Sequence, residues 1–387
     1  MTSQPWHSKA FGNLSMLASD PVDMEIAFQL EILHGAAVST ARPDRPLLNE
    51  DDGGVYTLPL GGRCAAVFDG MGGLAFGREV SGYLADKFKA TLLKDGEVPT
   101  AKTLADIVFD INSDLPGRSF GVGGSTATVA LRIPSADGRD DLIICSQGDS
   151  RAYVFDKKTL RPVTVDNLNV DPLLKDFEQL LAMKAFHRSN GSTLIDRYLY
   201  TYGQLCADLT TSFVWGTNAD GELDSRYQWP KEYAPLFSCL FVGDRPLSDI
   251  PLSEPVKGAV WLCISDSRFD SLFCESDQLF LSRTTGEALS LQERQIVNNR
   301  HLVGNAIMGL YPAVPCVFTS KIERDACVVV VTDGVTDNLT DSQIRDCLCL
   351  GRDETELATG LLERAYRESL SQTNRRAKED DITVCVI

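Results

Sequence analysis

Basic residues are scarce in this 387-residue sequence: 37 lysines and arginines stand against 54 aspartates and glutamates, for a formal net charge of −17. So acidic a chain lacks the positive surface that binds the phosphates of nucleic acids or anionic lipids, and we expect neither partner. No apolar run is long enough to cross a bilayer, and the first residues lack the basic flank and apolar core of a secretion signal. These absences predict a cytoplasmic protein.

Histidine is rarer still, with four residues, and the 11 cysteines are scattered and odd in number. His187 and His301 lack the spacing of paired metal ligands, and Cys347-Leu348-Cys349 has no second metal-type pair. Several other cysteines lie inside apolar runs, where a free thiol acts as a small hydrophobe. We therefore expect a reducing compartment and no zinc site.

The chain is long enough for one large domain or two ordinary ones, and 43% of its residues are hydrophobic. Residues 1–30 carry little pattern and are interpreted as an N-terminal extension. Residues 31–387 are interpreted as one domain, interrupted by an insertion at about 171–288. Strands are expected at 32–38, 56–60, 63–68, 123–131, 142–145, 152–155, 260–269, 278–281, 327–331 and 382–387. Helices are expected after Gly73 to about 93, at 102–115, 173–186 and 354–370, and from about 341. The two strands that flank Gly148-Asp149 are expected to form an antiparallel pair.

The stretch from Cys64 to Gly73 is the most informative one. An apolar strand, Cys64 to Phe68, runs directly into Asp69-Gly70. A carboxylate at the end of a buried strand is costly unless something pairs with it, and the glycine lets another group approach the backbone closely. Asp-Gly is also a strong hairpin-turn pattern, so this stretch alone leaves a turn and a metal site as alternatives.

The same pattern recurs along the chain. Apolar strands lead to Asp149 and Asp333 as they do to Asp69, while Asp380-Asp381 opens the last strand and Glu50-Asp51 precedes the first of these sites. Turns explain the set poorly, because each acid lies at the end of a buried strand. If the strand ends converge, the carboxylates repel one another unless divalent cations bind there. Ligation by oxygen alone suits Mg or Mn better than Zn.

Six motifs, in order, resemble a known family: NED, VFDGMGG, GGSTATVAL, QGDSRAYVF, VVTDGVTDNL and EDDITVCVI. They resemble the metal-dependent protein serine/threonine phosphatases of the PPM (2C-like) type. The resemblance covers about 32–166 and 289–387, and leaves 171–288 as an insertion larger than the usual flap of the family. It implies an α+β fold in which two antiparallel sheets pack face to face, with helices outside and a two-metal centre at one end.

The resemblance also implies roles for individual residues. Asp69 would bridge both ions, the Gly70 carbonyl would ligate one of them, and Asp333 and Asp380 would hold the other. Asp149 and Asp337 would form a third, weaker site. Glu50 and Asp51 would orient metal-bound waters. Asp381 is the alternative to the adjacent Asp380. Each acid has a plainer interpretation as a turn or helix-capping residue.

The activity that follows is hydrolysis of phosphoserine or phosphothreonine in a phosphoprotein. Two Mg or Mn ions would lower the pKa of a shared water, and the resulting hydroxide would attack phosphorus in line. No enzyme nucleophile is needed, so Ser125 and Ser150 are interpreted as structural hydroxyls.

Two positions depart from the family pattern. Met71 stands where many members carry a histidine that is a candidate general acid, so the leaving-group proton would come from water or another acid. Pro46 stands where members often carry a phosphate-binding arginine. Arg45, one residue back, or Arg42 is expected to take that role, since a guanidinium suits phosphate; an ordinary surface arginine is the alternative.

Two other functions remain open at this point. The chain could be a pseudophosphatase, a binding module that acts through 171–288. It could also be a phosphatase for small phosphoesters, with the insertion as a lid. Residues 171–288 are in either case a candidate contact for a protein partner or a second copy.

Overall fold

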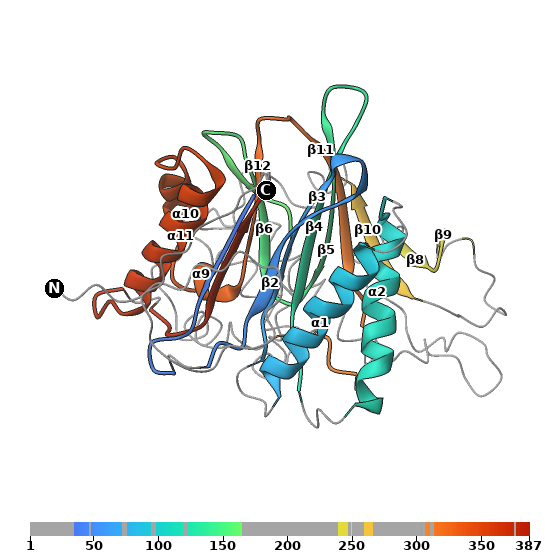
Figure 1. Ribbon diagram of the computed structural model, residues 1–387, viewed down its shortest axis with the longest axis horizontal. Helices are drawn as coiled ribbons and strands as arrows, with labels where there is room; N and C mark the ends of the chain where they lie inside the picture. Colours follow the sequence, from blue (N-terminus) through green and yellow to red (C-terminus); the bar gives the residue numbers. More distant parts are fainter. Residues whose placement is uncertain are drawn as a thin grey trace, which may run out of the picture.

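Two β-sheets lie face to face, and helices cover the outer face of each (Figure 1). The computed structural model describes residues 35–45, 48–71, 76–93, 98–118, 123–164, 239–246, 249, 259–265, 303, 306–309, 313–374 and 377–387. Over this part of the chain the architecture is α+β, as the sequence predicts, with layers in the order helix, sheet, sheet, helix.

The larger sheet has eight strands in the order β2-β3-β4-β5-β11-β10-β8-β9. These are β2 Asp52–Thr57, β3 Arg63–Phe68, β4 Ala127–Pro134, β5 Asp140–Gln147, β8 Leu240–Val242, β9 Arg245–Pro246, β10 Val260–Ser265 and β11 Cys316–Ile322. Neighbouring strands are antiparallel except β10 and β11, which are parallel, so the expected wholly antiparallel sheet is corrected at this pair.

The smaller sheet has five antiparallel strands in the order β1-β13-β12-β6-β7. These are β1 Ala36–Thr40, β6 Arg151–Phe155, β7 Leu160–Pro162, β12 Cys327–Val331 and β13 Ile382–Val386. The last strand of the chain therefore lies between the first strand and β12, which brings both ends of the described chain into one sheet.

Helices flank both sheets. Helices α1 Gly77–Leu92 and α2 Ala101–Asp114 pack on the larger sheet, while α10 Asp341–Leu348 and α11 Glu354–Ser369 pack on the smaller one. The short helix α9 Asp333–Thr336 directly follows β12, and 3₁₀ turns occupy Pro59–Gly61 and Leu115–Gly117. Among the described residues, no helix combines the length and apolarity needed to cross a bilayer.

Strand β12 shows why the central strands are apolar throughout. Val328 and Val330 point into the core between the two sheets, whereas Val329 and Val331 point into the core beneath α10 and α11. Successive side chains of a strand face opposite sides, so a strand covered on both faces has no polar side. A run of this kind predicts a buried strand, and the structure confirms it.

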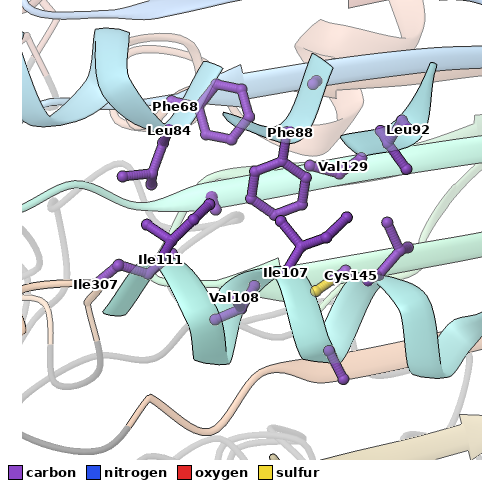
Figure 2. Packing of buried hydrophobic residues seen from close by; sticks show 14 of the residues in the cluster. Phe68, Leu84, Phe88, Leu92, Ile107, Val108, Ile111, Val129, Cys145 and Ile307 are labelled. Atoms are coloured by element: carbon purple, nitrogen blue, oxygen red, sulfur yellow. The ribbon is translucent and has the colours of Figure 1, made fainter. Parts of the chain in front are cut away.

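The core beneath α1 and α2 is built from a helical spacing of apolar side chains (Figure 2). Leu84 and Phe88 lie one turn apart on α1, and the ring of Phe88 packs on that of Phe68 from β3 with centroids 5.3 Å apart. Ile107 and Ile111 approach the same sheet from α2. This packing fixes the end of β3, and with it the position of the residues that follow.

The strands around Gly148-Asp149 differ from expectation. They were expected to form an antiparallel pair, but β5 belongs to the larger sheet and β6 to the smaller one. Gly148 has a φ of 107°, a left-handed conformation that glycine adopts readily. The dipeptide therefore carries the chain from one sheet to the other rather than closing a hairpin.

Part of the expected insertion belongs to the larger sheet. Strands β8, β9 and β10 lie within 171–288 and extend that sheet beyond β11. The strand expected at 260–269 is confirmed over Val260–Ser265. The helix expected at 173–186, the strand at 278–281, His187 and His301 lie outside the described residues.

Candidate metal centre

The acidic strand ends meet where the two sheets face each other. Strand β12 ends just before Asp333, and β13, its antiparallel partner, begins just after Asp380 and Asp381. Strand β3 of the other sheet ends just before Asp69. The charges of Asp333 and Asp380 both act on the carboxyl of Asp69, so the three segments share one region. The structure thus places Asp69, Asp333 and Asp380 in one region.

The glycines after two of these aspartates allow close backbone approach. The N–H of Gly70 donates to the carbonyl of Glu50 at 3.1 Å, and a Cβ on Gly70 would lie 2.4 Å from that oxygen. A Cβ on Gly334 would lie 1.9 Å from the carbonyl oxygen of Asp381. After Asp69 the chain goes on to α1 rather than back along β3, so the hairpin interpretation of Asp69-Gly70 is wrong.

Lys378 occupies the middle of one group of acids. Its Nζ lies 2.8 Å from Oδ2 of Asp333, 2.8 Å from Oδ2 of Asp337 and 2.7 Å from Oδ2 of Asp380. Lys378 is not among the residues that the sequence motifs indicate. The sequence places it two residues before Asp380, which indicates that it is near the site. Nothing in the sequence shows that its side chain points to the acids.

The pKa values in this group reflect opposing effects. Burial lowers the pKa of Lys378, but the carboxylates of Asp333, Asp337 and Asp380 raise it by more, so the ammonium stays charged at neutral pH. Burial, together with the charge of Asp333, raises the pKa of Asp380 to about 7 despite the opposing effect of Lys378. Burial and the neighbouring carboxylate thus oppose ionisation of Asp380, whereas Lys378 favours it.

Asp69 and Asp51 lie beside that group. Burial raises the pKa of the Asp69 carboxyl well above its ordinary value, and the charges of Asp333, Asp51, Asp380 and Asp149 raise it further. Burial and the charge of Asp381 raise the pKa of Asp51 in the same way. A carboxylate that is desolvated beside other carboxylates is one that a bound cation would stabilise strongly.

Two hydroxyls hold Asp51 in place. Its Oδ2 accepts hydrogen bonds from Oγ1 of Thr332, at 2.9 Å, and Oγ1 of Thr383, at 2.7 Å. Thr332 follows β12 and Thr383 lies in β13. The adjacent Glu50 is buried, and burial raises its pKa. Asp51 thus lies among the central acids and is fixed to the smaller sheet, whereas Glu50 is joined to Gly70 through its backbone carbonyl.

The adjacent acids Asp380 and Asp381 have different environments. Both oxygens of Asp381 accept backbone hydrogen bonds of 2.7 Å, Oδ1 from the N–H of Arg42 and Oδ2 from the N–H of Glu50. Oδ2 of Asp380 instead faces Lys378 and the other acids. Asp381 joins the loop before β2 to the start of β13, and Asp380 is the one that belongs to the acidic group.

The remaining expected residues are less uniformly placed. Asp149 is buried and its charge acts on Asp69, and Asp337 lies at Lys378. Ser150 hydrogen-bonds Thr126 at 2.8 Å, in line with a structural hydroxyl. The backbone of Met71 donates to the carbonyl of Gly124.

The two candidate phosphate-binding arginines differ in the contacts that their side chains make. The guanidinium of Arg42 donates to both oxygens of Asp44, at 2.5 and 2.8 Å. Arg45 is exposed, and the charges of both arginines act on the carboxyl of Glu50. Pro46, between Arg45 and the acids, lies outside the described residues.

The donor set fits a hard divalent ion, but the side chains are arranged around an ammonium. Carboxylates and the Gly70 carbonyl are the oxygen ligands that Mg or Mn prefers. Among the described residues, however, no group of three or more His, Cys, Asp or Glu side chains is positioned to hold a metal ion as it stands. The contacts of 2.7–2.8 Å that Asp333, Asp337 and Asp380 make with Lys378 suit an ammonium, whereas Mg–oxygen bonds are about 2.0–2.1 Å.

The architecture is similar to that of solved bacterial phosphatases. The serine/threonine phosphatase Stp1 from Staphylococcus aureus superposes with a TM-score of 0.51 at 15% identity, covering 95% of this chain and 98% of that one. A bacterial serine phosphatase gives a TM-score of 0.50 at 13% identity, covering 92% and 97%. No family model matches the sequence, and no curated protein matches it either. At these identities the likeness concerns the fold, and it confirms the PPM-type architecture that the motifs imply.

Proposed function

We propose that this protein is a phosphatase that uses Mg or Mn to hydrolyse phosphoserine or phosphothreonine in a protein substrate. The observation that carries the proposal is the meeting of Asp69, from the larger sheet, with Asp333 and Asp380, from the smaller one. Such a concentration of buried carboxylates is unfavourable for folding unless a cation offsets it, and its position matches the end of the sandwich where the resemblance places the metal centre.

The candidate ligands are Asp69, the Gly70 carbonyl, Asp333 and Asp380. A divalent ion bound there would supply positive charge that attracts a phosphate dianion and activates water. The resemblance implies two ions and a third, weaker site at Asp149 and Asp337. Asp381 is the poorer candidate, because both of its oxygens already accept backbone hydrogen bonds.

Other residues of the chain would position the reactants. Asp51, fixed by Thr332 and Thr383, can accept a hydrogen bond from water through its carboxylate, and Glu50 offers a second acceptor. The exposed guanidinium of Arg45 can bind two phosphate oxygens. Hydrolysis breaks the bond between phosphorus and the serine or threonine oxygen, which leaves with a proton. Met71 has no proton to donate, so water or another acid supplies it.

A second candidate is a pseudophosphatase, and one observation favours it. Lys378 already provides a positive charge among Asp333, Asp337 and Asp380, and so stabilises them without a metal. In that case 171–288 would serve as the partner-binding surface.

A cytoplasmic location remains a prediction; the nine described cysteines, all free, are compatible with it.

The test is Mn-dependent hydrolysis of p-nitrophenyl phosphate by the wild type, Asp69→Asn and Asp106→Asn. Asp69→Asn preserves shape and removes the charge. Asp106 lies on the exposed side of α2, paired with Lys102, and controls for loss of a surface carboxylate. We expect Mn-dependent turnover in the wild type and the control, and a loss of about a hundredfold or more in Asp69→Asn.

Two further results would redirect the proposal. Absence of turnover on both the aryl phosphate and a phosphopeptide library, with Mn bound, would favour the pseudophosphatase. Turnover of small phosphoesters with no hydrolysis of phosphopeptides would favour the third candidate, a small-molecule phosphatase.

A further inference from the structure

The ammonium of Lys378 lies where a cation would be expected. It donates a hydrogen bond to Asp333 at 2.8 Å and forms ion pairs with Asp337 and Asp380 at 2.8 and 2.7 Å. These acids come from two segments, the α9 region and the stretch just before β13. The lysine therefore joins the same segments that a metal ion would join.

The backbone around Lys378 is held as firmly as its side chain. Its N–H donates to Oδ1 of Asn338 at 2.9 Å, and Nδ2 of Asn338 donates back to its carbonyl at 2.9 Å. Nδ2 of Asn338 also donates to the carbonyl of Gly334, within α9. Asn338 is fully buried, so this clamp fixes the start of the lysine side chain beside the acids.

An ammonium and a metal ion exclude each other at this position. Both need the same Oδ2 atoms of Asp333 and Asp380, and two cations sharing those oxygens would repel strongly in a poorly solvated region. For a metal ion to bind there, the ammonium of Lys378 would have to leave, breaking all three of its charged contacts. The side chain is 26% exposed, so it has a route to solvent.

We propose that Lys378 is a built-in cation that competes with a divalent ion at Asp333, Asp337 and Asp380, and so determines how many ions the centre binds. The inference rests on the proposed function only in taking these carboxylates as metal ligands. In the wild type, Lys378 stabilises Asp333, Asp337 and Asp380. An ion at Asp69 and Gly70 would therefore bind more readily than an ion at those three acids.

The experiment compares Mn binding by the wild type, Lys378→Met and Lys157→Met, using calorimetry and the electron paramagnetic resonance of unbound Mn. Methionine keeps the length and removes the charge. Lys157 pairs with Asp325 at 2.6 Å on the surface and serves as the matched control. We expect Lys378→Met to bind one more ion than the wild type, or to bind it about tenfold or more tightly, because no charged contacts need to be broken first.

Thermal unfolding gives a readout that does not depend on activity. Without metal, Lys378→Met should melt below the wild type, since three carboxylates lose their counter-ion, and Mn should raise its melting temperature by more than it raises that of the wild type. Lys378→Gln is the second variant and should behave in the same way. If either variant folds only when Mn is present, that too supports the proposal.

Equal stoichiometry and affinity in the wild type and both variants would overturn the proposal, as would failure of both variants to fold even with Mn, because the side chain would then be purely structural. The two proposals can fail separately. A gain of Mn binding without phosphatase activity leaves the competition intact, whereas Mn-dependent turnover with no gain in Lys378→Met refutes only the competition.

Discussion

The N–H of Glu50 donates a 2.7 Å hydrogen bond to Oδ2 of Asp381, which lies 331 residues further along the chain. The other oxygen of Asp381 accepts from the N–H of Arg42 at 2.7 Å. One buried carboxylate thus holds the loop that carries Glu50 and Asp51 against the start of β13. This contact, made by the poorer of the two candidate ligands Asp380 and Asp381, helps to assemble the site.

The first prediction separates Asp381 from Asp380. Asp381→Ala leaves two backbone donors without acceptors, which should lower the free energy of unfolding by about 2–5 kcal/mol. Asp380→Asn should change stability less but weaken Mn binding by about tenfold or more, since it removes a charged oxygen ligand. Chemical denaturation and calorimetric Mn titration measure the two effects. A larger loss of Mn affinity in a folded Asp381→Asn protein than in Asp380→Asn would reverse the assignment.

The second prediction concerns two glycines. A Cβ on Gly334 would lie 1.9 Å from the backbone oxygen of Asp381, so Gly334→Ala must push α9 away from β13. We expect a loss of about 3 kcal/mol or more in unfolding free energy. Gly360, in the middle of α11, is the control: its nearest neighbour for a new Cβ is Sγ of Cys347 at 3.8 Å, an ordinary contact. Gly360→Ala should be neutral or stabilise by up to about 1 kcal/mol. Similar effects of the two substitutions in thermal unfolding would contradict this.

Much of the framework could be predicted because it depends on local patterns. Strand β12 is apolar on both faces, and this predicts a strand covered on both sides. Asp69 and Asp333 each follow a buried strand, and this pattern predicted that their carboxylates lie close together. The glycine after Asp69 also indicated close backbone approach, which the structure confirms at Gly70; Gly334, after Asp333, has the same feature.

The remaining features depend on contacts between distant segments. Nothing in the sequence distinguishes Asp380 from Asp381, because their different roles come from backbone donors more than 300 residues away. In the sequence, Lys378 resembles an ordinary solvated lysine. In the structure, its backbone is bound to Asn338, and its side chain points to the acids. The strands β5 and β6 are adjacent in sequence, yet their assignment to different sheets depends on which partners compete for their edges.

The third prediction concerns thiol reactivity. Cys64 and Cys145 are fully buried, and burial raises the pKa of both thiols, so access and ionisation both disfavour reaction. Cys349, at the end of α10, is exposed. At pH 8 iodoacetamide should modify Cys349 in the folded protein and reach Cys64 and Cys145 only after denaturation. Peptide mass spectrometry over time measures this, with Cys349→Ser as the control. Modification of Cys64 at a rate near that of Cys349 would show that the β3 region opens readily.

The last prediction distinguishes the two arginines. The charges of both arginines act on Glu50, but Arg42 would have to exchange its two hydrogen bonds to Asp44 for phosphate, whereas Arg45 is exposed. In the Mn-dependent phosphatase assay, Arg45→Ala should raise KM for the aryl phosphate by about tenfold with a smaller change in kcat, because a phosphate contact is lost.

Arg42→Ala should have the weaker effect on KM, and Asp44→Ala, which releases Arg42, should partly restore phosphate binding when combined with Arg45→Ala. That restoration is specific to a guanidinium that was held back by Asp44, and a general loss of surface charge would not produce it. If Arg42→Ala raises KM more than Arg45→Ala does, the ion pair with Asp44 must open when phosphate binds, and Arg42 is then the residue that holds the substrate.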